Sequence, residues 1–192
     1  MTSLTEFNEL ICECQKCPLG KTRNKFVFGS GNHNAKVMVV GEGPGADEDA
    51  SGLPFVGRAG ELLTKMMAAI GFSREEIFIA NVVKCRPPGN RTPNDSEITE
   101  CLPYLLKQIQ LIKPVMILCA GTTAIQALMG RKGSLGSFRS QFYNLEDALV
   151  LATYHPAALI RNPEWKKPAW EDLKMFRSKY NELTGEIFEI KG

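Results

Sequence analysis

The sequence predicts an α/β protein in which a four-stranded parallel sheet lies between two layers of helices, a three-layer α/β/α sandwich. Segments with helical periodicity alternate with short apolar runs, and strands that alternate with helices form sheets covered on both faces. The apolar runs are almost uninterrupted and rich in β-branched residues, which is typical of parallel strands buried on both sides. They are Lys36–Val40, Ile77–Val83, Val115–Cys119 and Leu149–Thr153.

The helices are predicted from apolar spacing and from residues that begin or end helices. Gly71 follows one periodic segment, and glycine commonly terminates a helix. Asn94 and Asp95 precede another segment and are suitable caps, although Pro103 within it predicts a kink or a later start. The expected helices are Thr5–Cys12, Gly57–Ile70, Ser96–Leu111, Thr122–Met129 and Trp165–Leu183.

The properties of the whole chain place few limits on function. A chain of 192 residues has the length of one domain, and we expect residues 1–192 to form it. The formal net charge of +2 does not decide whether nucleic acid is a partner, because positive charge can gather at one edge of a nearly neutral protein. Apolar runs are too short to span a bilayer, and Met1–Leu10 contains Glu6 and Glu9, unlike a secretory signal. We therefore expect a cytoplasmic protein without a membrane partner.

The cysteines suggest metal ligation. Disulfides are rare in a reducing compartment, so six cysteines are better explained by metal binding or catalysis. Cys14 and Cys17 form a C-x-x-C pair, and Cys85 and Cys101 can complete a set of four thiolates. Zinc and an iron–sulfur cluster both accept four thiolates, so the spacing leaves the two open. Cys119 lies within an apolar strand, and we interpret it, like Cys12, as a free thiol.

The segments that follow the predicted strands carry the candidate functional residues. Ligands of open α/β sheets bind beyond the carboxyl ends of the strands. Three of the four segments there contain reactive side chains or a glycine-rich backbone. The segments are Gly41-Glu42-Gly43-Pro44-Gly45, Lys84-Cys85-Arg86-Pro87-Pro88, Gly121-Thr122-Thr123 and Tyr154-His155-Pro156-Ala157.

Six blocks of the sequence together resemble the family 4 uracil-DNA glycosylases, the iron–sulfur glycosylases of bacteria and archaea. The similarity runs in order from about Cys14 to Pro163, and Glu42 distinguishes it from the related family 5, which lacks an acid there. The blocks are Cys14-x-x-Cys17-Pro18-Leu19, Val27–Gly31, Gly41–Gly45, Leu53–Gly57, Asn81–Pro88 and His155–Pro163.

The resemblance implies a [4Fe–4S] cluster on Cys14, Cys17, Cys85 and Cys101, and hydrolysis of the bond between uracil and deoxyribose in DNA. Bond cleavage builds positive charge on the sugar and negative charge on the departing base. By resemblance, Glu42 holds the water and stabilises the sugar. His155 and backbone N–H groups of the glycine-rich loop, including Gly41 and Gly43, stabilise the base. A neutral imidazole suffices for this role, whereas His33 lies among glycine and asparagine and is expected at the surface.

Three further residues are expected to recognise a uracil that has been flipped out of the DNA. Phe55 can stack on the base, and the amide of Asn81 offers a donor and an acceptor that match O4 and N3–H of uracil but not cytosine. Glu48 is a candidate for excluding the methyl group of thymine, although a solvated acid beside Asp47 and Asp49 explains it equally well. Without the resemblance, Phe55 is explained by core packing and Asn81 by a local backbone hydrogen bond.

DNA contacts are expected in the loop that follows His155. Leu159 or Ile160 can wedge into the gap left by the flipped base, and Arg161 is a candidate phosphate contact. The resemblance implies uracil-containing DNA, single- or double-stranded, as the partner, and the protein is expected to be a monomer. Whether a sliding clamp docks on a terminus is left open.

The sequence is compatible with three alternatives. The same fold can excise another base such as hypoxanthine, or the protein can be a non-catalytic DNA-binding module that carries the metal. Glu42, Asn81 and His155 at three strand ends disfavour the second. A small-molecule enzyme that holds phosphate at Gly41–Gly45 is disfavoured because no Lys-Ser/Thr follows these glycines, so they are not a P-loop.

Overall fold

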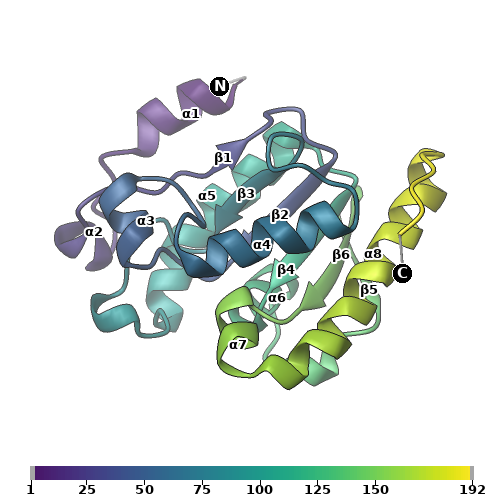
Figure 1. The fold of residues 1–192 in the computed structure, drawn as a ribbon. Helices are drawn as coiled ribbons and strands as arrows, with labels where there is room; N and C mark the ends of the chain where they lie inside the picture. Colours follow the sequence, from purple (N-terminus) through teal and green to yellow (C-terminus); the bar gives the residue numbers. More distant parts are fainter. Residues whose placement is uncertain (1–2, 191–192) are drawn as a thin grey trace.

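The protein is built around a mixed β-sheet, seen here in a computed structural model that describes residues 3–190 (Figure 1). Within these residues the sheet has six strands in the order β1-β3-β2-β4-β6-β5. The four inner strands are parallel, with Val40 paired to both Ala80 and Cys119. The strands are β1 (Ser30–Gly31), β2 (Val37–Gly41), β3 (Phe78–Asn81), β4 (Met116–Ala120), β5 (Phe142–Leu145) and β6 (Ala148–Thr153).

The inner strands confirm the predicted parallel sheet, but the predicted number of four strands is wrong. Antiparallel strands border it on both sides: β1 pairs with β3, and β5 forms a hairpin with β6. The reason for the difference is burial. Edge strands are covered less completely than inner ones, and the residues of β5 are half-buried or exposed, so they do not form an uninterrupted apolar run.

All five predicted helices are present within two residues of the expected ends. Helix α5 (Asp95–Ile112) continues past Pro103, so the later start expected from this proline is wrong. A capping box at Asn94 and Glu97, in which Asn94 N–H donates to Glu97 Oε2 at 2.8 Å, begins that helix. The five are α1 (Leu4–Ile11), α4 (Arg58–Ala69), α5 (Asp95–Ile112), α6 (Thr122–Met129) and α8 (Lys166–Thr184).

Three short helices were not predicted, and all lie in segments rich in glycine, proline or charge. They are α2 (Leu19–Thr22), α3 (Ala46–Ser51) and α7 (Pro156–Arg161). The stretch after His155, expected as a loop, is therefore helical. Pro156 occupies the first helical position, where its fixed φ is favourable and its missing N–H costs nothing.

The apolar side chains form two clusters, one on each face of the sheet, which confirms the three-layer arrangement. Along β2, Met38 and Val40 enter one cluster while Val37 and Val39 enter the other, as the alternation of a strand requires. Helices α1, α5 and α6 cover the first face, and α4, α7 and α8 cover the second (Figure 1). No helix within residues 3–190 is long and apolar enough to cross a membrane.

Candidate active site

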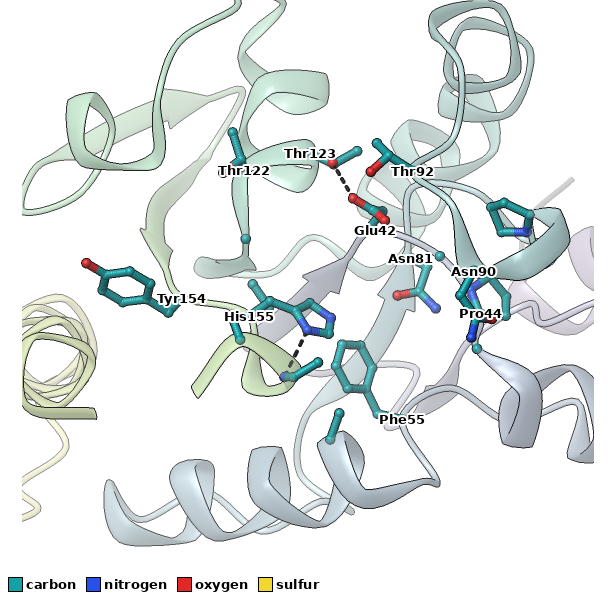
Figure 2. A pocket seen from close by; sticks show the side chains of 18 of the residues that line it. Glu42, Pro44, Phe55, Asn81, Asn90, Thr92, Thr122, Thr123, Tyr154 and His155 are labelled. Carbon is teal, nitrogen blue, oxygen red and sulfur yellow. Dashed lines mark hydrogen bonds between the residues drawn. The ribbon is translucent and has the colours of Figure 1, made fainter. Parts of the chain in front are cut away.

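A cavity of about 880 Å³ lies beyond the carboxyl ends of the inner strands (Figure 2). It is within the size range of small-molecule sites in proteins. Glu42, Phe55, Asn81 and His155, which come from four separate segments, all line it. The structure therefore brings together the four residues on which the sequence prediction of an active site rests.

Gly41, the last residue of β2, makes room for two of these side chains. A Cβ atom at this position would lie 2.4 Å from Asn81 Oδ1 and 2.6 Å from Phe55 Cζ, closer than real contacts allow. Phe55 itself has a left-handed backbone with φ of 53°, in the turn that precedes α4. The amide and the ring therefore converge where the backbone carries no side chain.

Asn81 ends β3 and has an unusual hydrogen-bonding state. Its side chain is 2% exposed, and its Oδ1 atom has no hydrogen-bond partner. A buried acceptor without a partner is costly and rare in native proteins. This amide does not bond local backbone, which was one of the two interpretations from sequence, and it is free to bind a ligand.

His155 is the N-cap of α7, and this position determines which of its nitrogen atoms carries the proton. Nδ1 accepts a hydrogen bond from Ala157 N–H at 3.1 Å, so the proton of the neutral ring is on Nε2. Burial, assisted by the charge of Arg161, lowers the pKa of His155 to about 4. The ring also stacks on Phe55, with centroids 5.5 Å apart. At neutral pH, His155 is thus an uncharged hydrogen-bond donor.

Glu42 is held by Thr123, a residue to which the sequence alone assigned no role. Thr123, near the start of α6, donates a hydrogen bond from its hydroxyl to Glu42 Oε2 at 2.5 Å (Figure 2). A hydrogen bond to a carboxylate is among the stronger ones in proteins. The position of Thr123 directly after a predicted strand was the available signal, but only the structure pairs it with Glu42.

Glu48 lines the cavity and is not a solvated acid. Its carboxylate accepts hydrogen bonds from the backbone N–H groups of Gly45 at 3.0 Å, Val56 at 3.0 Å and Gly57 at 3.3 Å. These contacts cap α3 and connect it to the loop that carries Phe55. Its neighbour Asp49 is buried too, at 2% exposure.

The expected DNA-contacting residues separate into buried and accessible ones. Leu159 is 2% exposed and belongs to the apolar cluster beneath α7, so its proposed role as a wedge is corrected. A loop would have left it exposed, but the helix turns it toward the core. Ile160 is half-buried and Arg161 is exposed, and both remain accessible to DNA.

The four cysteines of the predicted metal site lie near one another, and all are free thiols. Burial raises the pKa of Cys101 to about 11. The charge of Lys84 acts against this shift, and the charges of Cys85 and Cys17 act with it. Burial likewise raises the pKa of Cys85. The hydrogen bond and the charge of Arg23 act against this shift, and the charges of Cys17 and Cys14 act with it.

Three of these sulfur atoms already accept hydrogen bonds. Tyr104 Oη donates to Cys14 and an Arg23 nitrogen donates to Cys85, both at 3.2 Å, while Lys84 N–H donates to Cys101 at 3.3 Å. Such donors stabilise thiolates. Within residues 3–190, no group of three His, Cys, Asp or Glu side chains is close enough to hold a single metal ion directly.

Comparison with known proteins identifies the class to which this fold and site belong. Residues 28–174 match the model of the uracil DNA glycosylase superfamily. The matched segment contains the inner strands and every residue named above around the cavity.

Individual relatives narrow the class further. A type-4 uracil-DNA glycosylase of Pyrobaculum aerophilum is 47% identical over 181 residues, covering 90% of this chain and 92% of the relative. The type-4 enzyme of Archaeoglobus fulgidus is 40% identical, covering 97% and 96% of the two chains, and that of Thermotoga maritima is 42% identical, covering 89% and 91%. The chain belongs to the type-4 uracil-DNA glycosylase family.

Proposed function

We propose that this protein hydrolyses the N-glycosidic bond between uracil and deoxyribose in DNA and leaves an abasic site, the first step of base excision repair. The observation that carries the proposal is the cavity in which a buried amide with an unpaired oxygen, a neutral imidazole and a carboxylate face one another. We also propose that residues 1–192 act as one domain and as a monomer.

Recognition of uracil rests on the amide of Asn81. Its unpaired Oδ1 can accept a hydrogen bond from N3–H of uracil, and its Nδ2 can donate to O4. Cytosine presents a bare nitrogen and an amine at these positions, so buried groups would remain unpaired, a mismatch that discriminates strongly. Phe55 stacks on the base, and the carboxylate of Glu48, held by three N–H groups, excludes the methyl group of thymine.

Catalysis follows from where charge develops as the bond breaks. The sugar becomes positive, and Glu42, oriented by Thr123, stabilises it and positions the attacking water. The base leaves with negative charge on O2, and His155 Nε2–H donates to that atom without transferring its proton. Because the imidazole is neutral before the reaction, it carries no positive charge that would bind the uracil anion and slow its release.

Backbone groups of the Gly41–Gly45 loop assist His155, with Gly43 among them. The N–H of Gly45 already donates to Glu48, so it does not take part. At the mouth of the cavity, Arg161 contacts phosphate, and Ile160 enters the space that the flipped nucleotide vacates.

We propose that the cysteine site holds a [4Fe–4S] cluster, as the resemblance to the iron–sulfur glycosylases implies. The charges of Cys14 and Cys17 act on Cys85, and those of Cys85 and Cys17 act on Cys101, which supports one group held by all four thiols. Cys14, Cys17, Cys85 and Cys101 would hold it, and it would supply a cross-link between the N-terminal segment, the loop after β3 and α5.

The decisive experiment is incubation of the protein with a labelled oligonucleotide that contains one uracil, followed by alkali to cleave abasic sites. We expect cleavage at uracil only, and none when thymine or hypoxanthine replaces it. Removing a hydrogen-bond donor to a developing negative charge costs roughly 10²–10³-fold in rate. We expect this loss for His155→Ala but not for the exposed control His33→Ala. Wild-type rates in both His155→Ala and Glu42→Gln would refute the mechanism.

A further inference from the structure

The cavity extends well beyond the residues that recognise uracil. From Phe55 and Asn81 it continues past His155 to Tyr154 and Trp165, which also line it. Figure 2 shows Tyr154 on the side of His155 opposite to Phe55. A single pyrimidine occupies only part of a cavity of about 880 Å³, a volume that suits drug-sized ligands. The aromatic end of the cavity therefore has no role in the uracil excision described above.

Trp165 offers an accessible aromatic surface at this end. It lies directly before α8 and is 38% exposed, so its indole is not an ordinary core residue. The indole stacks on the ring of Tyr154, with centroids 5.1 Å apart and planes inclined by 29°. One aromatic ring thus supports another whose remaining surface faces solvent and the cavity.

The supporting ring of Tyr154 is itself held rigidly. Arg139 donates a hydrogen bond to Tyr154 Oη at 3.2 Å, and its guanidinium lies 4.5 Å from the centre of the ring. Asp172 fixes that guanidinium through two hydrogen bonds, at 2.7 and 3.0 Å, and is itself buried. An aromatic surface that is already ordered loses little conformational freedom when a ligand stacks on it.

The surroundings of Trp165 carry the charge that a nucleic-acid backbone requires. Arg161, Lys166 and Lys167 are exposed on either side of it, against one exposed acid, Glu164. Accessible aromatic rings among cations are the usual means by which proteins hold single-stranded nucleic acid, the rings stacking on bases and the cations contacting phosphates.

We propose that Trp165 stacks on the base next to the extruded uracil nucleotide in the same DNA strand. The inference rests on the proposed function, because it assumes that a uracil occupies the Phe55 end of the cavity. The neighbouring nucleotide is connected to the uridine by one phosphate, so it must lie at the mouth of the same cavity. Stacking there compensates for the stacking that the neighbour loses when the uridine leaves the strand.

The test uses single-stranded oligonucleotides, in which no opposite strand contributes bases. One contains uracil between two ordinary nucleotides, and two others carry a base-free spacer on the 5′ or the 3′ side of the uracil. For the wild-type protein we expect one of the two spacers to raise KM by about five- to 150-fold, the range for loss of one base–aromatic stack. Trp165→Ala should raise KM to a similar extent on the ordinary substrate, and it should cause no further rise in KM on the substrate with that spacer. Trp165→Phe should retain most of the affinity.

A binding measurement complements the kinetics. The chain has two tryptophans, so Trp170→Phe leaves Trp165 as the sole indole, and an oligonucleotide stacked on it should quench its fluorescence. An oligonucleotide with the effective spacer should quench it far less. Equal effects of Trp165→Ala on all three substrates, or no effect of either spacer, would overturn the proposal. Absence of uracil release by the wild-type protein would instead refute the proposed function, so the two failures are distinguishable.

Discussion

The hydrogen bond between Thr123 and Glu42 leads to the sharpest mutational prediction. Thr123→Val removes the hydroxyl that donates to Glu42 Oε2 at 2.5 Å and leaves a side chain of nearly the same shape. A hydrogen bond to a charged group contributes about 1.5–3 kcal/mol. If Thr123 positions the carboxylate for the transition state, kcat should fall by roughly 10- to 150-fold. Because the change acts on the carboxylate proposed to stabilise the sugar and not on Asn81 or Phe55, which are proposed to bind the base, KM should remain close to the wild-type value.

Two variants separate positioning of Glu42 from a general disturbance of α6. Thr123→Ser restores the hydroxyl and should recover most of kcat. Thr122→Val makes the same change one residue earlier in the helix, at a residue that lines the cavity but does not bond Glu42 (Figure 2), and it should leave kcat unchanged. Single-turnover rates of uracil release measure these effects. The reasoning is refuted if Thr123→Val keeps the wild-type rate or if Thr122→Val loses as much.

Three further predictions concern His155, the cysteines and Gly41. Burial lowers the pKa of His155 to about 4 from about 6.5 in the unfolded chain, so this residue should contribute a loss of unfolding free energy as pH falls from about 6.5 to 4. His155→Gln should abolish that contribution, and an NMR titration midpoint near 6.5 would contradict the assignment. If the proposed cluster is present, Cys85→Ala should remove its brown colour and lower the melting temperature, whereas Cys12→Ala, which alters a partly exposed thiol, should do neither. Gly41→Ala places a Cβ against Asn81 Oδ1, in the amide proposed to recognise uracil, and should weaken excision severely. Gly136→Ala, whose Cβ meets nothing closer than 3.8 Å, should not, and equal activity of the two variants would disprove the close approach.

Much of the fold was predictable from the sequence because burial leaves a periodic pattern along a continuous segment. The inner strands are covered on both faces and therefore appear as apolar runs, and α4 and α8 show the spacing of helices with one buried side. Strand β5 could not be recognised in this way. It lies at an edge where its residues are half in solvent, and it is defined by its pairing with β6. The helical form of residues after His155 was also missed, and with it the burial of Leu159.

The candidate site, like the fold, was predictable from the sequence only in part. By itself, the sequence determined which residue types stand at the strand ends, since Glu42, Asn81 and His155 follow or end strands that its apolar runs reveal. Only the tertiary structure decided which contacts the cavity residues make. It pairs Thr123 with Glu42, leaves the oxygen of Asn81 unpaired and stacks Trp165 on Tyr154. Each of these depends on how separate segments approach one another in space. Such approach is set by the packing of helices and loops on the sheet, and it leaves no periodic signal in any one segment.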